Sequence, residues 1–250
     1  MTKHVLFEIG LEELPARFVD DAEKQLKDKT KEWLQESRIT FDSIKSFSTP
    51  RRLAVIIENI ADVQTTIENE VRGPQISVAK DENGEWTKAA IGFARGQGIS
   101  VDDLFEKTVK GKTYVFAIKR IEGKPTYEVL PEFQKIISSI NFSSNMRWGT
   151  NSLRFARPIR WLVGLYGPEI IPFEIAGVKS GNVTKGHRYL GEQIVLNHPL
   201  EYEVKLKENF VIADSKDRER LILQGIKELE TERGFQVIVD DALLNEVKNL

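Results

Sequence analysis

The stretch His4–Ser37, HVLFEIGLEELPARFVDDAEKQLKDKTKEWLQES, contains the two patterns that decide the fold class. Apolar side chains alternate from Val5 to Ile9, which is the two-residue period of a β-strand. Pro15 follows at a position where the first turn of a helix tolerates proline. Beyond it, apolar residues recur at helical spacing with charge on the other face: Phe18, Ala22, Leu26, Trp33 and Leu34. We therefore expect a strand and then an amphipathic helix over Pro15–Ser37.

Outward from this stretch, the same periods predict further elements. Strands are expected at Arg52–Ile60, Ile159–Leu165, Ile170–Ile175 and Asn209–Ala213, with a hairpin of Phe105–Val109 and Thr113–Ile121. Helices are expected at Thr87–Gln97, at Tyr127–Ile140, at Ser215–Arg233 and from Asp240 onward. The helix at Ser215–Arg233 is expected to begin with a cap at Asp214 or Ser215 and to end at Gly234. The helices 15–37 and 215–233 both have apolar stripes, so both are expected to pack on a sheet.

Strands and helices are interspersed without a regular βαβ rhythm, which predicts an α+β fold of mixed sheets and packed amphipathic helices. A length of 250 residues with 40% hydrophobic residues suffices for a buried core. We expect two subdomains, an N-terminal α+β subdomain over 1–125 and a basic α+β subdomain over 126–250 that continues into a helical region. The last helix reaches Leu250 without a C-terminal signal, so the chain is expected to continue beyond it.

The residue types and segments that the sequence lacks exclude several classes of protein. There is no cysteine, which excludes disulfides, thiolate nucleophiles and thiolate metal sites. The first ten residues lack the positive flank and long apolar run of a signal peptide. No apolar run approaches the ~18–20 residues needed to cross a bilayer. We expect a cytoplasmic protein that does not associate with membranes.

Charge is distributed unevenly along the chain. The net charge of −2 argues by itself against a nucleic-acid partner. Between Phe133 and Gly191, however, only Glu169 and Glu174 are acidic, against eight basic residues: Lys135, Arg147, Arg154, Arg157, Arg160, Lys179, Lys185 and Arg188. Such asymmetry favours a polyanionic partner.

The most informative basic segment is Asn145–Gly167, NMRWGTNSLRFARPIRWLVGLYG. It has no acidic residue and combines four arginines with three aromatic residues: Arg147, Arg154, Arg157, Arg160, Trp148, Phe155 and Trp161. Guanidinium groups bind phosphates in bidentate fashion, and both they and aromatic rings stack on exposed bases. The alternative is that the aromatic residues belong to the core and the arginines form a solvated rim. For Arg157 a second alternative is a buried structural arginine.

A glycine-rich segment, Ser180–Gly191 with the sequence SGNVTKGHRYLG, follows. Glycines allow its backbone amides to approach an anion closely, while Lys185, His187 and Arg188 supply polar and positively charged side chains. The segment matches neither the P-loop pattern nor the dinucleotide-binding fingerprint, and glycine-rich segments more often only turn the chain.

Two shorter motifs have structural as well as functional interpretations. Thr49–Ala54, TPRRLA, places paired arginines before a strand, where such pairs are usually just solvated. Glu8–Pro15, EIGLEELP, has three carboxylates that suit acid–base or metal chemistry. A simpler interpretation is that Glu12 and Glu13 stabilise the positive end of the following helix.

Catalytic and metal-binding patterns are poor. The histidines, His4, His187 and His198, are scattered and form no HExxH or HxH motif. There is no GxSxG motif and no nucleotide-binding loop, so we expect no catalytic residue and no metal site.

Four of these segments, in this order, resemble the N-terminal signatures of the beta subunit of bacterial glycyl-tRNA synthetase. They are EIGLEELP, TPRRLA, the MRWG…FARPIRWLVGLYG run and SGNVTKGHRYLG. AAIGFARGQG (Ala89–Gly98) and PFEIAGVKSG (Pro172–Gly181) fit as well, while Arg72-Gly73-Pro74 and Tyr189 are minor variations on the family pattern. The resemblance covers essentially the whole chain, and four motifs in order at comparable spacing make it specific.

The resemblance implies an alpha2beta2 enzyme in which the alpha subunit binds glycine and uses ATP and Mg in both chemical steps. The beta subunit of this family recognises tRNA, and its HD-like helical and anticodon-binding domains would lie beyond Leu250. The partners implied are therefore the alpha subunit and tRNA(Gly). No cofactor is expected in this chain, and by itself it is expected to be inactive.

The leading hypothesis is a tRNA-binding, non-catalytic subunit of a ligase. Its candidate RNA-binding residues are Arg147, Arg154, Arg157, Arg160, Lys185, His187 and Arg188. One alternative is an enzyme or binding module for a phosphorylated metabolite, with the Arg147–Arg160 and Lys185–Arg188 segments as its anion site. Another is a structural scaffold in which the arginines pair across an interface with a partner protein.

Overall fold

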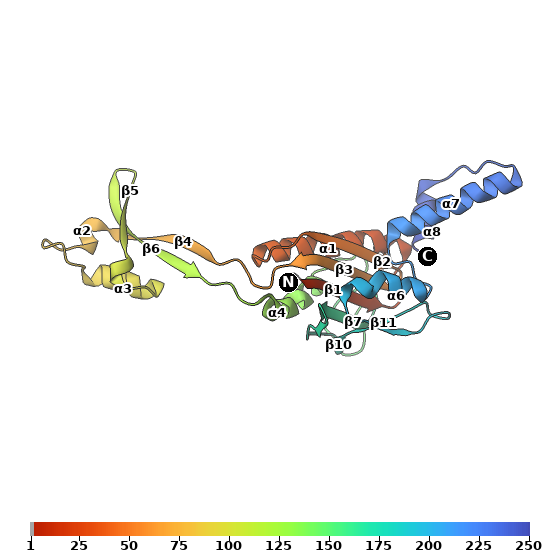
Figure 1. The fold of residues 1–250 in the computed structure, drawn as a ribbon, viewed down its shortest axis with the longest axis horizontal. Coiled ribbons are helices and arrows are strands. Elements are labelled where there is room, and N and C mark those ends of the chain that lie inside the picture. The colour runs from red at the N-terminus through yellow and green to blue at the C-terminus, as the bar shows by residue number, and fades with distance from the viewer. Residues whose placement is uncertain (1–2) are drawn as a thin grey trace. The chain divides into compact units, whose positions relative to one another are not determined.

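The structure, a computed structural model, describes residues 3–250, which form two compact units (Figure 1). The first unit comprises residues up to Val63 together with Pro125–Leu250, and the second comprises Gln64–Lys124. These units differ from the predicted subdomains 1–125 and 126–250, because strands from both ends of the chain share one sheet. The predicted boundary coincides with the point at which the chain re-enters the first unit.

The elements of the first unit are interspersed as the α+β prediction requires, and the fold class is confirmed. Its strands are β1 (Lys3–Leu11), β2 (Ser43–Thr49), β3 (Arg52–Ile60), β7 (Ile159–Tyr166), β8 (Glu169–Ile170), β9 (Glu174–Ile175), β10 (Val178–Gly181), β11 (Val183–Lys185) and β12 (Gln193–Val195). Its helices are α1 (Ala16–Glu36), α4 (Thr126–Val129), α5 (Phe133–Ser138), α6 (Tyr202–Glu208), α7 (Ser215–Arg233) and α8 (Asp241–Lys248), with short 3₁₀ turns at Leu130–Glu132 and Pro199–Glu201.

Within the described residues, the first unit is built on a seven-stranded sheet in the order β2-β3-β1-β7-β10-β9, with β8 paired to β7. β1 lies between β3 and β7 and is antiparallel to both, whereas β10 runs parallel to β7. In this register Gly10 is the partner of Arg52 on one side and of Trp161 on the other. The predicted strands 5–9, 52–60 and 159–165 are confirmed.

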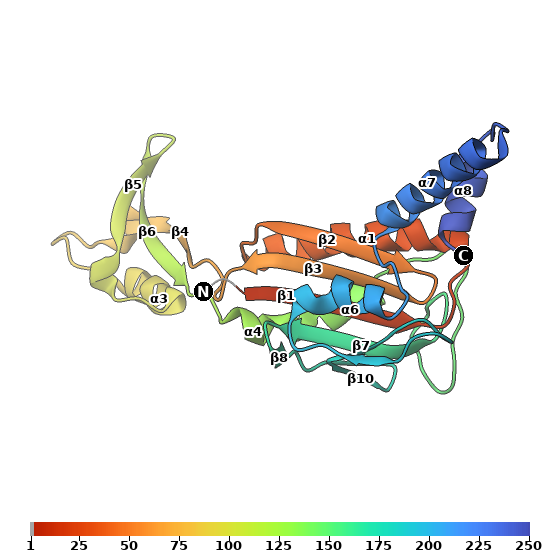
Figure 2. The same ribbon diagram turned by 45° about the vertical axis from the view of Figure 1, so that its right-hand side comes forward.

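The two faces of the sheet are covered differently, because side chains of a strand alternate between faces. Phe7 and Ile9 of β1 belong to a large core beneath α1 and α5, where Phe7 stacks on Phe133 with ring centroids 3.6 Å apart. Leu6, with Trp161 of β7, belongs to a second core beneath α6. Figure 2 shows α6 in front of β1 and β3, with α1 behind β2. The helix predicted over 15–37 is thus confirmed, and its apolar stripe is buried.

The second unit has a three-stranded sheet in the order β4-β6-β5. Its elements are β4 (Ile67–Gln75), α2 (Ile76–Ala79), α3 (Lys88–Gln97), a 3₁₀ turn at Val101–Asp103, β5 (Phe105–Val109) and β6 (Lys112–Ile121). Small residues dominate its core, and the left-handed Gly98 ends α3. The predicted hairpin and helix in this region are confirmed.

The C-terminal helices differ from expectation in their packing. α7 forms as predicted, with the Asp214 side chain accepting from the amides of Lys216 and Asp217, and with Gly234 in the left-handed conformation at its end. However, no residue of α7 is buried, so its stripe does not pack on a sheet. The predicted strand at Asn209–Ala213 is also wrong, because this segment is a turn and coil after α6. Among residues 3–250, no helix combines the length and apolar character that crossing a membrane requires.

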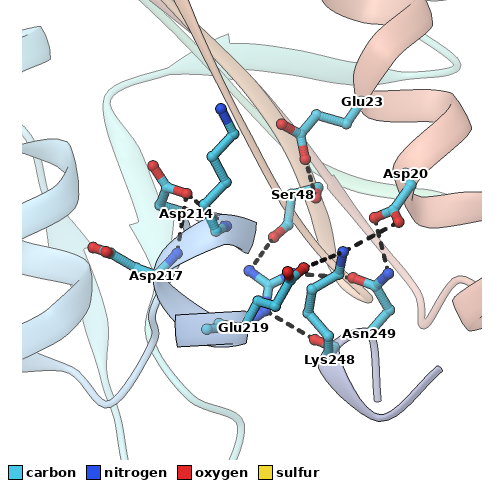
Figure 3. A network of polar contacts seen from close by, with 10 residues as sticks. Asp20, Glu23, Ser48, Asp214, Asp217, Glu219, Lys248 and Asn249 are labelled. Atoms are coloured by element: carbon cyan, nitrogen blue, oxygen red, sulfur yellow. Dashed lines mark hydrogen bonds and ion pairs between the residues drawn. The ribbon is translucent and has the colours of Figure 1, made fainter. Parts of the chain in front are cut away.

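The α7–α8 pair is attached to the rest of the first unit by polar contacts (Figure 3). Arg218 donates hydrogen bonds to the carbonyls of Ser48, Ile212, Ala213 and Lys248 and to the Asn249 side chain, at 2.7–3.1 Å. Lys248 forms ion pairs with Asp20 and Glu219 at 3.4 and 3.3 Å. Partly buried hydrogen bonds and ion pairs, rather than an apolar stripe, therefore attach these helices.

Candidate nucleic-acid interface

Four segments that are distant in sequence meet at one end of the seven-stranded sheet. The amides of Leu11 and Leu14 donate to the carbonyls of Arg51 and Pro50, and the amide of Glu12 donates to the carbonyl of Pro158. The loop after β11 reaches the same end through Arg188, which pairs with Glu13. We call this end the strand-end surface, and its charged and polar residues are Glu12, Glu13, Arg51, Arg157, Arg160, Lys185, His187 and Arg188.

A buried polar layer lies beneath this surface. A Cβ atom added to Gly10 would lie 1.8 Å from the Trp161 ring, so only glycine leaves room for that ring against β1. The indole nitrogen of Trp161 donates to the Glu8 carboxylate at 3.1 Å, and the Thr184 hydroxyl donates to the same oxygen at 2.8 Å. Arg52 lies 3.5 Å from that oxygen, and both charged side chains are almost fully buried. Glu8, Arg52 and Thr184 thus fix β1, β3 and β11 relative to one another.

This ion pair does not fully compensate its own burial. Burial raises the pKa of Glu8, while Arg52, Thr184 and Trp161 oppose that rise. The second carboxylate oxygen of Glu8 has no hydrogen-bond partner within residues 3–250. The layer is therefore a polar cluster in a dry environment, where each remaining partner matters for stability.

Trp161 in turn positions cations. The Arg51 and Arg52 guanidinium carbons lie 5.9 and 5.8 Å from its ring centroid, and the Lys185 ammonium lies 5.1 Å from it. These distances are within the range of a cation–π interaction. Arg51 forms no ion pair with any residue of 3–250, and its Nε atom is buried without a hydrogen-bond partner. A half-buried arginine that lacks an acidic partner is suited to bind an external anion through its terminal nitrogens.

Three of the predicted site arginines contact one short acidic segment. Arg160 forms an ion pair with Glu12 at 3.1 Å, and Arg188 with Glu13 at 3.3 Å. The Nε of Arg157 donates to the Glu13 carbonyl at 3.0 Å. Arg157 is exposed, so the alternative of a buried structural arginine is wrong. Glu12 and Glu13 contact these arginines, and the first turn of α1 has no acidic residue. The predicted role of Glu12 and Glu13 in stabilising the positive end of that helix is therefore not observed.

The glycine-rich loop is closed by its own hydrogen bonds. The amides of Gly186, His187 and Gly191 donate to backbone carbonyls, and those of Tyr189 and Leu190 donate to His187 Nδ1. A Cβ atom on Gly191 would lie 2.5 Å from the His187 nitrogen and 2.6 Å from the Asn209 oxygen. The glycines therefore permit close backbone packing, and the expectation that these amides bind an anion is wrong. Any anion bound by this loop must therefore be held by its side chains.

Two adjacent open cavities occupy this surface. One of ≈ 290 Å³ is lined by cationic residues and by large apolar ones, including Arg51, Arg188, Arg218, Tyr189, Phe210 and Leu250. The second, of ≈ 260 Å³, shares Arg51, Gly186, His187 and Arg188 with the first and adds Lys185. Glu13 and Glu192 are the acidic lining residues, and Glu13 is already paired with Arg188. The cavities are therefore predominantly cationic.

Arg147 and Arg154 lie elsewhere on the same segment. The backbones of Met146 and Phe155 pair through hydrogen bonds of 2.8 and 3.2 Å in an isolated antiparallel bridge. The adjacent residues, Arg147 and Arg154, are both exposed, and we call this bridged pair the Arg147–Arg154 ladder. Neither arginine lines either strand-end cavity. Phe155 and Trp161 are buried and Trp148 packs against the core, so the aromatic residues of this segment are structural, as the alternative interpretation held.

Sequence reasoning missed three residues of this site. Arg51 was assigned to a solvated pair, and no pattern distinguished it from the buried Arg52. Its position in the turn between β2 and β3 was not predictable, because β2 itself was not expected. Tyr189 and Phe210 also line the first cavity, and the incorrect strand at 209–213 concealed the turn that contains Phe210.

Comparison with known proteins agrees with the four motifs. The family described as glycyl-tRNA synthetase beta subunit matches residues 5–250. The glycine–tRNA ligase beta subunit of Oceanobacillus iheyensis is 56% identical over 250 residues, which are 100% of this chain and 36% of that protein.

Two further relatives with the same name are similar. The protein of Halalkalibacterium halodurans is 54% identical over 245 residues, which are 98% of this chain and 35% of the relative. That of Bacillus subtilis is 46% identical over 246 residues, which are 98% of this chain and 36% of the relative. The chain thus spans about a third of the length of these relatives. It belongs to the glycyl-tRNA synthetase beta subunit family.

Proposed function

We propose that this chain is a tRNA-binding part of the beta subunit of a glycine–tRNA ligase and that its strand-end surface binds the phosphate backbone of tRNA(Gly). Family membership supports the role in glycyl-tRNA synthesis. The observation that carries the assignment of the surface is Arg51, a half-buried guanidinium without an acidic partner in the part of the chain described. It lines both cavities together with Arg188.

The charges of the surface suit a polyanion. Five cationic side chains gather there, namely Arg51, Arg157, Arg160, Lys185 and Arg188, against the three carboxylates of Glu12, Glu13 and Glu192. The ion pairs of Arg160 with Glu12 and of Arg188 with Glu13 are exposed. Water and salt therefore screen these pairs, which contribute little to stability. A phosphate group can therefore replace a carboxylate as the partner of Arg160 or Arg188 at small cost. Such contacts position RNA without reading its sequence.

The exposed Arg147–Arg154 ladder forms a second basic element of the proposal. It makes no ion pair within residues 3–250, so its charges remain available to a phosphate backbone. His187 is assigned a supporting role, because its Nδ1 atom accepts from two amides of its own loop and so fixes the loop that contains Arg188.

In this proposal the chemistry belongs to a separate alpha subunit, in an alpha2beta2 assembly in the cytoplasm. The alpha subunit would bind glycine, ATP and Mg²⁺, and this chain would supply tRNA contacts. The strand-end cavities suit Mg²⁺ poorly, because this ion prefers several oxygen ligands whereas Glu13, which lines the first cavity, is paired with Arg188. We accordingly assign no catalytic residue to this chain.

A phosphorylated metabolite is the second candidate ligand, because a cationic cavity of ≈ 290 Å³ also suits a small anion. The two ligands differ in how affinity depends on salt. A tRNA contact releases counterions along an extended backbone, so several residues contribute to one steep log–log slope. A small anion would depend mainly on the cavity residues and would not require the exposed ladder.

The experiment measures tRNA binding to the full-length subunit in complex with its alpha subunit, over a range of salt concentrations. Arg51→Ala, Arg188→Ala and Arg154→Ala should each weaken binding and flatten the slope by about one unit or slightly less. Arg220→Ala is the matched control, because Arg220 is also exposed and ion-paired, at 3.2 Å to Asp217, but lines neither strand-end cavity. Unchanged affinity and slope in all three variants would refute the proposal. Retained tRNA binding with loss of inorganic phosphate binding in Arg51→Ala would favour the metabolite.

A further inference from the structure

Two large aromatic side chains protrude at the first strand-end cavity. Tyr189 is 81% exposed and Phe210 is 63% exposed, and both line the cavity that Arg51 and Arg188 also line. The other large aromatic residues of this end, Phe155 and Trp161, are buried. Exposed aromatic rings next to cationic side chains are the arrangement that proteins use to bind bases and phosphates together.

Hydrogen bonds join the two backbone segments that contain these rings. The amide of His187 donates to the Asn209 carbonyl at 2.9 Å, and the amide of Glu192 donates to the Asn209 side chain at 3.2 Å. Asn209 precedes Phe210, so the loop that contains Tyr189 is tied directly to the turn that contains Phe210. Gly191 packs closely on the Asn209 oxygen, which restricts movement of the loop relative to the turn.

The conformation of Phe210 is unfavourable for a residue of its type. Its φ of 62° lies in the left-handed region, which bulky residues rarely adopt and glycine or asparagine adopts readily. Exposure of the ring forgoes the burial that would stabilise it. A strained and exposed aromatic residue on the rim of a cationic cavity points to a role in binding.

A cation is already associated with one ring. The Arg188 guanidinium carbon lies 5.7 Å from the centroid of the Tyr189 ring, while Arg188 also pairs with Glu13. Arg51 also lines this cavity and has no acidic partner within residues 3–250. The cavity thus combines donors for one phosphate group with apolar rings for one planar group.

From these contacts we propose that the first strand-end cavity binds an unpaired nucleotide of RNA. Arg51 and Arg188 hold its phosphate, and its base stacks on Tyr189 and Phe210. The nucleotide must be unpaired, because bases within a duplex stack on their neighbours and do not present a free face. This inference rests on the proposed tRNA-binding function and deepens it, since it names the structural feature of the RNA that the site selects.

The test compares a single-stranded oligoribonucleotide with a blunt-ended RNA duplex, both binding to the full-length subunit in its complex with the alpha subunit. Loss of one stacking contact lowers affinity by roughly 5- to 150-fold. Tyr189→Ala should therefore weaken single-strand binding by such a factor without changing the salt slope, because no charge is lost. Tyr189→Phe should retain affinity, since it keeps the ring. Duplex binding should be unaffected in both variants.

Phe210→Gly keeps the test independent of folding. Glycine adopts the observed φ without strain, so this variant should fold at least as well as the original chain and still lose single-strand affinity. Phe235→Ala is the matched control, because Phe235 is 51% exposed but does not line the cavity.

The outcomes separate this inference from the proposal on which it rests. If Tyr189→Ala and Phe210→Gly bind the single strand as the original protein does, while Arg188→Ala weakens tRNA binding, the cavity holds phosphate only and the nucleotide inference is wrong. If Arg51→Ala, Arg188→Ala and Arg154→Ala are also without effect, both proposals are wrong. Equal weakening of duplex and single-strand binding by Tyr189→Ala would likewise overturn selection of an unpaired nucleotide.

Discussion

The Arg52 guanidinium lies 3.5 Å from the Glu8 carboxylate, and the two side chains are 2% and 0% exposed. This buried pair joins β3 to β1 directly below the strand-end surface, and Arg52 also donates to the Lys185 carbonyl at 2.6 Å. The same carboxylate accepts hydrogen bonds from Trp161 and Thr184. The position of the cations on the surface therefore depends on a polar cluster in the core.

Removing one partner of this pair should be costly. Arg52→Met leaves the Glu8 carboxylate buried without its countercharge, which typically destabilises a protein by about 3–5 kcal/mol. The free energy of unfolding should fall by that amount at neutral pH. Adding Glu8→Gln to this variant should restore much of the loss, because no uncompensated charge then remains. A double-mutant cycle from denaturant unfolding measures the coupling, and additive losses would contradict it.

The pH dependence of stability follows from the raised pKa of Glu8. A carboxyl group whose pKa is higher in the folded state binds its proton more tightly there than in the unfolded chain. Stability from this group is therefore greatest below the pKa of the unfolded state, and it decreases as pH rises toward the folded pKa. Unfolding free energies measured as pH rises above the ordinary carboxyl range should show a larger decrease in the original protein than in Glu8→Gln, where the raised pKa of Glu203 remains. Parallel pH profiles would contradict the assignment.

Gly10 should tolerate no larger residue. A Cβ atom there would lie 1.8–2.4 Å from three atoms of the Trp161 ring, which is itself buried. Gly10→Ala should destabilise the first unit by about 3 kcal/mol or more, as expected for overpacking a rigid core. The matched control is Gly225→Ala in α7, where a Cβ atom meets nothing within 4 Å. It should stabilise the chain by about 0.5–1 kcal/mol. Equal melting temperatures for the two variants would contradict this account of Trp161.

Arg218 should control the attachment of α7 and α8. Burial lowers the pKa of Arg218, and its guanidinium donates to four backbone carbonyls and one side-chain amide. Lysine keeps the charge but cannot reproduce the planar fork of donors. Arg218→Lys should therefore increase amide hydrogen exchange in residues 215–250 while leaving β1 and β7 protected. Unchanged exchange in that region would show that the contacts of Lys248 and Asn249 with Asp20 hold the helices without Arg218.

Periodicity predicted the elements that bury a full apolar face. β1, β3 and β7 follow from short apolar runs, because both faces of these strands are buried. α1 follows from helical spacing, because one face of this helix is buried. β2 and β4 were not predicted, since polar and charged residues interrupt their apolar pattern, as in SIKSFST and IENEVRGPQ. The apolar run at 209–213 predicts a strand, but residues 211–213 are coil. Their pattern resembles that of a strand because Val211 and Ala213 are buried in the core beneath α6.

The candidate site was predictable in composition but not in arrangement. The sequence indicated that Arg157, Arg160 and Arg188 belong to basic motifs, but not that Glu12 and Glu13 would bring them together. Which arginine of the pair Arg51 and Arg52 is buried depends on strand register, because Arg52 pairs with Gly10 in β1. The role of Trp161 in positioning cations likewise required the fold.

Photo-crosslinking of tRNA(Gly) to the intact complex of alpha and full-length beta subunits tests the central proposal most directly. A photoreactive residue introduced at Arg154, Tyr189 or Arg51 should crosslink to tRNA, whereas one at the exposed Arg233 of α7 should crosslink much less. The yield at the first three positions should decrease with rising salt, because phosphate contacts dominate the binding. Crosslinks confined to other regions, with none at these three positions in a complex that still charges tRNA, would contradict the assignment of the strand-end surface.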